Sequence, residues 1–135
     1  EEAGPYREQA AAKGLDWVSL AAPTSGQERV ASIAEKATGF LFLISMTGVT
    51  GGDLEDTSAV EGMVKVANEA SNIPTCIGFG VRDAASAARL GSIADGVVVG
   101  SEIVRALRRG MESNQGVLPL KELVASLRAG LDGAS

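Results

Sequence analysis

Residues 40–44, Phe-Leu-Phe-Leu-Ile, form an unbroken apolar run that stops abruptly in a segment rich in glycine and threonine, residues 45–51. A run without polar alternation predicts a β-strand that is buried on both faces, as in a parallel sheet covered by helices. The glycines that follow favour a loop, because they have no side chain to pack. We therefore expect a chain of the α/β class, with its chemistry in the loops after the strands.

Helical and strand patterns alternate along the whole chain. Strands are predicted at 15–21, 40–45, 75–79 and 96–100, and none of them alternates polar with apolar residues. Helices are predicted at 5–13, 25–38, 58–71, 83–90, 101–108 and over the last apolar stretch near the carboxyl terminus. This order predicts one parallel sheet with right-handed crossovers. We expect a single domain over residues 1–135, built from the recurrent unit of a (β/α) barrel or a doubly wound sheet.

Three of the expected helices carry apolar residues at helical spacing, which predicts the side that each packs against the sheet. Ser25 and Glu28 have the spacing of a capping box and predict the start of the first of these helices. The predicted packing residues are Val30, Ile33, Ala34 and Ala37; Val60, Met63, Val64 and Ala67; and Leu120, Leu123, Val124, Leu127 and Leu131.

Composition excludes several classes of function. The formal net charge is −5 and basic residues cluster only at 105–109, which argues against a nucleic-acid partner. No apolar run approaches the roughly 20 residues that span a bilayer, so no membrane association is expected. The chain has no histidine, which excludes Ser-His-Asp and Cys-His catalysis and histidine-ligated metals within it. The one cysteine, Cys76, lies in mid-strand and is predicted to be buried and unreactive; it fits a reducing compartment.

Two neighbouring strands end in small residues that suit an anion site. The third strand ends in Gly-Phe-Gly at 78–80, and the fourth ends in Gly100 and Ser101, where a helix begins at once. The first N–H groups of a helix have no partner within it and carry the positive end of its dipole. This arrangement is that of the phosphate site in (β/α) barrels. The alternative for Gly100 and Ser101 is an ordinary tight turn with a helix cap.

The loop after residue 45 is the second candidate. Its length and the placement of Thr50 between glycines favour a lid over an ordinary connection. Asp53, Glu55 and Asp56 match no calcium-binding spacing, so a solvated acidic loop is expected and no metal site. Phe42 and Ile44 alternate within their strand and either line an apolar substrate pocket or belong to the core of the barrel.

Three segments together are specific: 40–51, then Ile-Gly-Phe-Gly-Val at 77–81, then Asp-Gly-Val-Val-Val-Gly-Ser-Glu-Ile-Val at 95–104. They resemble the tryptophan synthase alpha subunit family, and Leu-Ala-Ala-Pro-Thr-Ser at 20–25 matches that family's preceding strand end. The resemblance covers essentially the whole chain. Gly-Phe-Gly and Gly-Ser occur in many phosphate-binding barrels, whereas Thr-Gly-Val-Thr-Gly at 47–51 distinguishes this family.

The resemblance implies a (β/α)8 TIM barrel that cleaves indole-3-glycerol phosphate to indole and glyceraldehyde 3-phosphate. The reaction is a retro-aldol cleavage with carboxylates as acid and base, and this subunit holds no cofactor because pyridoxal phosphate belongs to the beta subunit, the expected partner. By the same resemblance, the phosphate-binding positions are Gly51, Gly80, Gly100 and Ser101. The indole pocket would comprise Phe42, Ile44 and Phe79, and Thr50 would support a catalytic aspartate when the lid closes.

The chain departs from the family in two respects. Met46 stands where an arginine is common, which removes an anchor of the closed lid. The chain also resembles only the second half of the barrel, about four βα units, beginning in the helix after the family's fourth strand. The family's catalytic glutamate and aspartate lie upstream of that point. We therefore expect the phosphate site, part of the indole pocket and the lid here, and no proton-transfer groups.

Three alternatives stay open. The chain could belong to a free-standing indole-glycerol-phosphate lyase, or to another phosphate-binding barrel enzyme such as an isomerase or synthase of aromatic or thiamine biosynthesis. It could also be a non-catalytic half-barrel that binds phosphate and associates with itself or with a missing N-terminal half. A cytoplasmic location is expected, or a plastid in a eukaryote.

Overall fold

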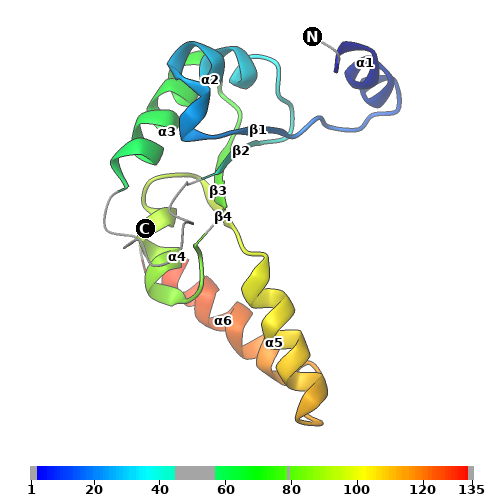
Figure 1. Cartoon of the computed structure of the whole chain (residues 1–135), viewed down its shortest axis with the longest axis vertical. Helices are drawn as coiled ribbons and strands as arrows, with labels where there is room; N and C mark the ends of the chain where they lie inside the picture. Colours follow the sequence, from blue (N-terminus) through cyan, green and yellow to red (C-terminus); the bar gives the residue numbers. More distant parts are fainter. Residues whose placement is uncertain (1–2, 45–56, 79, 134–135) are drawn as a thin grey trace.

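The computed structural model describes residues 3–44, 57–78 and 80–133, and its alternating helices and strands confirm the α/β class (Figure 1). The elements in chain order are α1 (Gly4–Ala12), β1 (Ser19–Ala21), the 3-10 turn η1 (Pro23–Ser25), α2 (Gln27–Ala34), β2 (Leu41–Ile44), α3 (Ser58–Ala70), β3 (Thr75–Gly78), α4 (Ala84–Gly91), β4 (Gly96–Val98), α5 (Ser101–Glu112) and α6 (Leu118–Asp132).

The four strands form one sheet in the order β1-β2-β3-β4, and every neighbouring pair is parallel. Consecutive strands are thus neighbours, as expected for repeated βα units. A side-chain bond ties the amino-terminal end of β3 to the start of β4: the backbone N–H and the hydroxyl of Thr75 donate to the Asp95 carboxylate over 2.8 and 3.1 Å.

One face of the sheet is covered by α2, α3 and α4, and the core lies between them (Figure 1). Leu41, Leu43 and Ile77 are fully buried on this face. The predicted packing side of α3 is confirmed, because all four of its apolar residues are buried, and in α2 three of the four predicted residues are buried. The buried members are Val60, Met63, Val64 and Ala67 from α3, and Val30, Ala34 and Ala37 from α2 and the turn after it.

The opposite face of the sheet is also apolar, and much of it is open to solvent. Phe42 and Ile44 are half-buried there, because alternate residues of a strand point to opposite faces. Leu20 of β1 is 55% exposed and Val98 of β4 is 37% exposed. Within the described residues β1 and β4 each have one strand neighbour, so each leaves a free backbone edge.

We expect this open apolar face and the two free strand edges to cause self-association of the isolated chain, because both features favour pairing with another chain. Light scattering should give a mass above that of the 13.7 kDa monomer. A monodisperse monomer that unfolds cooperatively would contradict this expectation.

The strand and helix limits differ from prediction at three places. The first strand was predicted from residue 15, but β1 begins at Ser19. Leu15 is 64% exposed, and Trp17 instead exchanges hydrogen bonds with Thr38: its N–H donates to Oγ1 over 2.6 Å, and its carbonyl accepts from the Thr38 N–H over 3.0 Å. The fourth strand ends at Val98 rather than at residue 100, and α5 continues to Glu112 rather than ending at 108.

The capping box predicted from Ser25 and Glu28 is wrong. Gly26 is the cap of α2, with a φ of 71° that suits glycine, and Ser25 belongs to the preceding 3-10 turn. The Ser25 hydroxyl accepts a hydrogen bond from the Ala22 N–H over 3.2 Å, so it stabilises that turn and does not cap the helix.

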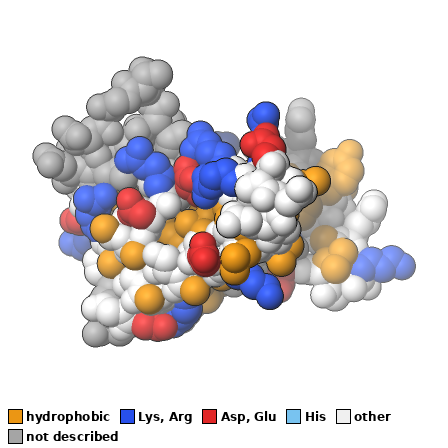
Figure 2. All heavy atoms as spheres, turned by 90° about the horizontal axis from the view of Figure 1, so that it is seen from below, with side chains coloured by type: hydrophobic (Ala, Val, Ile, Leu, Met, Phe, Trp, Pro, Cys, Tyr) orange, Lys and Arg blue, Asp and Glu red, His pale blue; other side chains and the backbone are white. Residues whose placement is uncertain are grey.

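Helix α6 packs on α4 and α5. The last two helices, α5 and α6, project from the sheet as a pair (Figure 1). Leu127 is buried as predicted, but Val124 is 49% exposed, which corrects its predicted place on the packing side. Seen from the far end of this pair, hydrophobic side chains lie exposed among charged ones (Figure 2). In the described part of the chain, no helix has the length and apolar character needed to cross a membrane.

Candidate functional site

The carboxyl ends of the last three strands are aligned by the sheet register. Ile44 of β2 is paired with Gly78 of β3, which in turn is paired with Val98 of β4. Gly80 and Gly100 each follow two residues after the paired positions of their strands. The structure therefore brings two of the three predicted phosphate-binding glycines, Gly80 and Gly100, to the same end of the sheet, where parallel α/β sheets bind ligands.

The amino terminus of α5 offers free hydrogen-bond donors at this edge. Gly100 is the cap residue and contributes no side chain, and its carbonyl accepts from the Ile103 N–H over 3.0 Å. Among the described residues no acceptor is found for the backbone N–H groups of Ser101 and Glu102. A twelve-residue helix with open N–H groups attracts an anion through both those groups and its dipole.

The connection between β3 and α4 is held in place from its far end. Gly80 has a φ of 80°, a conformation that other residues rarely adopt. Asp83 caps α4 by accepting a hydrogen bond from the Ser86 N–H over 2.8 Å, and the Ser86 hydroxyl accepts from the backbone N–H groups of Arg82 and Asp83 over 2.9 and 3.1 Å. These bonds fix the path of the chain directly after Gly80.

Removing the Asp83 carboxylate should weaken this cap. We expect Asp83→Ala to lower the free energy of unfolding by about 1 kcal/mol at pH 7, the usual effect of losing an N-cap. The Ser86 N–H, and then its hydroxyl, lower the pKa of Asp83. The stabilisation is therefore complete above the unfolded-state pKa of about 4 and is lost as the pH falls through the lower folded-state pKa. Urea unfolding at pH 7 and pH 2.5 measures the effect.

Asp83→Asn is the control, because asparagine caps helices well but does not titrate. Its stability relative to Asp83→Ala should stay constant between the two pH values. Equal stability of Asp83→Ala and the unchanged protein at pH 7 would show that the cap contributes nothing.

The predicted indole-pocket residues Phe42 and Ile44 share the open face of β2, next to the aligned strand ends. The Phe42 ring lies over Gly78: a Cβ atom built on Gly78 would stand 2.2 Å from two carbons of that ring. Any other residue at 78 would displace the ring. From the sequence alone Gly78 is predicted as part of the phosphate loop, and its role in leaving room for the ring follows only from the register between β2 and β3.

Several predicted site residues lie outside the described residues. These are Thr50, Gly51 and Phe79, together with Met46 and the acidic residues Asp53, Glu55 and Asp56. Of the eight predicted site residues, the structure thus places five: Phe42, Ile44, Gly80, Gly100 and Ser101.

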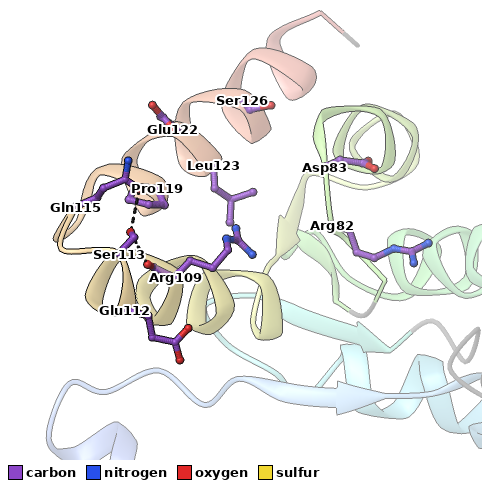
Figure 3. A pocket seen from close by; sticks show the side chains of 10 residues that line it. All are labelled: Arg82, Asp83, Arg109, Glu112, Ser113, Gln115, Pro119, Glu122, Leu123 and Ser126. Carbon is purple, nitrogen blue, oxygen red and sulfur yellow. Dashed lines mark hydrogen bonds between the residues drawn. The ribbon is translucent and has the colours of Figure 1, made fainter.

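A cavity of about 740 Å³ lies elsewhere, between the β3–α4 connection and the far part of the α5–α6 pair (Figure 3). Arg82 and Asp83 form one wall, and Arg109 points toward Leu123 on the other. Of the predicted phosphate-binding residues that the structure describes, Gly80, Gly100 and Ser101, none lines this cavity. Arg109 lies about 12 Å along α5 from Ser101. The predicted site at the strand ends is therefore separate from this cavity, whose lining combines positive and negative side chains.

Cys76 sits on the open face of β3 and is half-buried rather than fully buried as predicted. Burial, and then the negative charge of Asp95, raise the pKa of its thiol, so it is held in the unreactive protonated form. Within the described ranges, no three His, Cys, Asp or Glu residues gather closely enough to hold a metal ion.

Comparisons with known proteins show the family of the chain. The family model of the tryptophan synthase alpha chain matches residues 1–131. The tryptophan synthase alpha chain of Burkholderia thailandensis is 39% identical over 135 residues, which are 100% of this chain and 49% of that protein. The one from Dechloromonas aromatica is 40% identical over 132 residues, 98% of this chain and 49% of that protein.

A solved structure of Mycobacterium tuberculosis tryptophan synthase superposes with a TM-score of 0.79 at 36% identity, over 96% of this chain and 47% of the matched chain. The chain therefore spans about half the length of the curated relatives that it matches, and its four βα units are part of a TIM barrel. The chain belongs to the tryptophan synthase alpha chain family.

Proposed function

We propose that residues 1–135 are a single domain, the C-terminal half of a (β/α)8 barrel that cleaves indole-3-glycerol phosphate to indole and glyceraldehyde 3-phosphate. The proposal rests on one observation above others: the register brings Gly80, Gly100 and Ser101 together beside the free N–H groups of α5. In this role the chain binds the substrate's phosphate and contributes Phe42 and Ile44 to the indole pocket, without a cofactor of its own.

The binding step follows from the local chemistry. The phosphate accepts hydrogen bonds from the N–H groups of Ser101 and Glu102 and from the Ser101 hydroxyl, all in the first turn of α5. These two residues supply no basic side chain, so the donors are backbone and hydroxyl groups alone. This suits an acidic protein, because the attraction is local and needs no positive surface. Gly51 from the loop after β2 is proposed to complete the site, with Phe79 beside it and Thr50 supporting the lid.

The proton-transfer groups are proposed to come from the N-terminal half of the barrel. In the described residues, two carboxylates follow strand ends, and both are engaged: Asp83 caps α4, and Glu102 pairs with Arg105. Tryptophan synthase beta subunit is the proposed partner of the complete barrel, in a cytoplasmic setting. A free-standing lyase would share the same site but not this partner.

Inorganic phosphate tests the site on the chain itself. A Cβ atom at Gly100 would meet nothing within 4 Å, so Gly100→Leu should fold normally while its side chain obstructs the anion. Loss of one charge-assisted hydrogen bond, about 1.5–3 kcal/mol, should weaken binding at least about tenfold. Amide chemical shifts in an NMR titration measure the affinity and locate the anion.

Gly62→Leu is the matched control, because Gly62 lies on α3 with equally open space around it. It should leave phosphate affinity unchanged. Equal affinity of Gly100→Leu and the control, or phosphate shifts confined to residues away from Gly80, Gly100 and Ser101, would remove the proposed site.

A further inference from the structure

The exposed apolar side chains of this protein gather toward the two ends of the chain. Among the described residues, the large hydrophobic side chains that are exposed all belong to residues 6–20 or 98–124. These two segments contain the edge strands β1 and β4 and the helices beside them. Examples are Leu15, Val18 and Leu20 from the first segment and Val98, Val104 and Val124 from the second. The exposed apolar surface is therefore concentrated beside the two free backbone edges of the sheet.

The chain also exposes more surface than a compact protein of its mass. Its solvent-accessible surface is 8562 Å² for a mass of 13.7 kDa. The usual scaling of surface with mass gives about 6,600 Å² for a folded monomer of this size. The excess of about 2,000 Å² is larger than the roughly 800 Å² that each partner contributes to a standard protein interface. The excess surface is thus sufficient for a stable interface.

The two free edges are complementary to each other. All strands of the sheet are parallel, so β1 lacks a neighbour on one side of the sheet and β4 lacks one on the opposite side. A second copy related by a two-fold axis along the strands places its β4 beside β1 and its β1 beside β4, with every pair parallel. Two copies then supply eight parallel strands, the number that closes a (β/α) barrel with an interior filled by side chains.

The position of α1 leaves room for this arrangement. In a (β/α) barrel the helix that follows a strand packs in the outer ring. In the paired copies, α6 would therefore lie outside the junction between its own β4 and the second copy's β1. Helix α1 does not fill that place, because none of its residues is buried and it lies apart from the sheet and from α2, α3 and α4 (Figure 1).

We infer that the 135-residue chain pairs with a second copy of itself as a closed two-fold dimer, in which β1 of each copy adds to β4 of the other. The open face of the sheet, with Leu20, Phe42 and Ile44, becomes the interior of this barrel. Because Phe42 and Ile44 belong to the candidate apolar pocket, the second copy supplies the opposite wall of that pocket. The dimer goes beyond the proposed lyase, since it depends on strand edges and apolar surface and not on phosphate binding or catalysis.

Light scattering after size-exclusion chromatography, over a range of chain concentrations, gives the mass and the dissociation constant. We expect twice the mass of the 13.7 kDa monomer and no larger species, because closure leaves no free edge. Leu20→Lys and Val98→Lys should each raise the dissociation constant at least about tenfold, since each places a charge in the apolar interior. Asn68→Lys adds the same charge at an exposed position of α3 and should leave the dissociation constant unchanged.

Hydrogen exchange on the unchanged chain identifies the mode of pairing without any substitution. Raising the chain concentration should protect the amides of β1 and β4 together. A monomer at all concentrations, a mass that grows beyond the dimer, or protection of only one edge strand would each overturn the inference. Dissociation constants of Leu20→Lys and Val98→Lys equal to that of Asn68→Lys would do the same.

The phosphate titration described above separates this inference from the proposed function. Phosphate binding by a chain that stays monomeric would retain the proposed site and contradict the dimer. A closed dimer that binds no phosphate would retain the dimer and contradict the proposed site.

Discussion

Gly130→Val should destabilise the chain by about 3 kcal/mol, because it adds atoms to a tightly packed contact. Gly130 of α6 lies against the first residue of α4: a Cβ atom built there would stand 2.3 Å from the carbonyl oxygen of Ala84 and 2.9 Å from its carbonyl carbon and Cα. These are backbone atoms at the start of a capped helix, so they cannot rotate away. The helices must separate, which would expose Leu127 and loosen α6.

Gly62→Val provides the matched control, since it makes the same change in the interior of α3 where nothing lies within 4 Å of the added Cβ. Valine and glycine differ little in helix propensity, so its stability should stay within about 0.5 kcal/mol of the unchanged chain. Chemical denaturation followed by circular dichroism gives both values. Equal stability of the two variants would show that α4 and α6 do not pack as described.

The order of strands and helices was predictable because each element buries apolar residues at the regular spacing of a strand or a helix. The apolar run at 40–44 predicted a strand buried on both faces, and this is confirmed for one face only. Leu41 and Leu43 are fully buried on the face that the helices cover, whereas Phe42 and Ile44 on the other face are half-buried. The spacing of Val60, Met63, Val64 and Ala67 predicted one packing side, and that side is buried throughout. Apolar patterns predict the buried side of an element well, because burial of apolar surface is the main favourable term in stability.

Helix starts were less predictable, because short polar residues satisfy more than one hydrogen-bonding pattern. Ser25 matched a capping box with Glu28 but stabilises the 3-10 turn before α2. Asp83 and Ser86 form a true reciprocal cap on α4 and were overlooked, since serine replaces the usual Glu or Gln at the third helical position.

Close contacts between distant segments were not predictable from local patterns. Gly78 leaves room for the ring of Phe42, and Gly130 leaves room for the backbone of Ala84, yet each pair is far apart in the sequence. For the site, Gly80, Gly100 and Ser101 were predicted from the sequence, whereas their location at the same end of the sheet follows from the pairing of Gly78 with Val98.

The largest effect that we expect is on catalysis. Proton transfer by a positioned group is worth about 10²–10⁴-fold, and the proposed acid and base lie in the other half of the barrel. Phosphate binding holds substrate equally in the ground and transition states, so it lowers KM without accelerating bond cleavage. The 135-residue chain should therefore release no measurable indole by itself.

Indole release from indole-3-glycerol phosphate tests the account most directly. It is measured for the chain alone, for the N-terminal half of the Burkholderia thailandensis relative alone, and for the two together. The account predicts indole from the mixture only, and less of it when the chain carries Gly100→Leu. Release by the pure 135-residue chain would contradict the half-barrel account and direct the search for a base to Asp53, Glu55, Asp56 and Glu102.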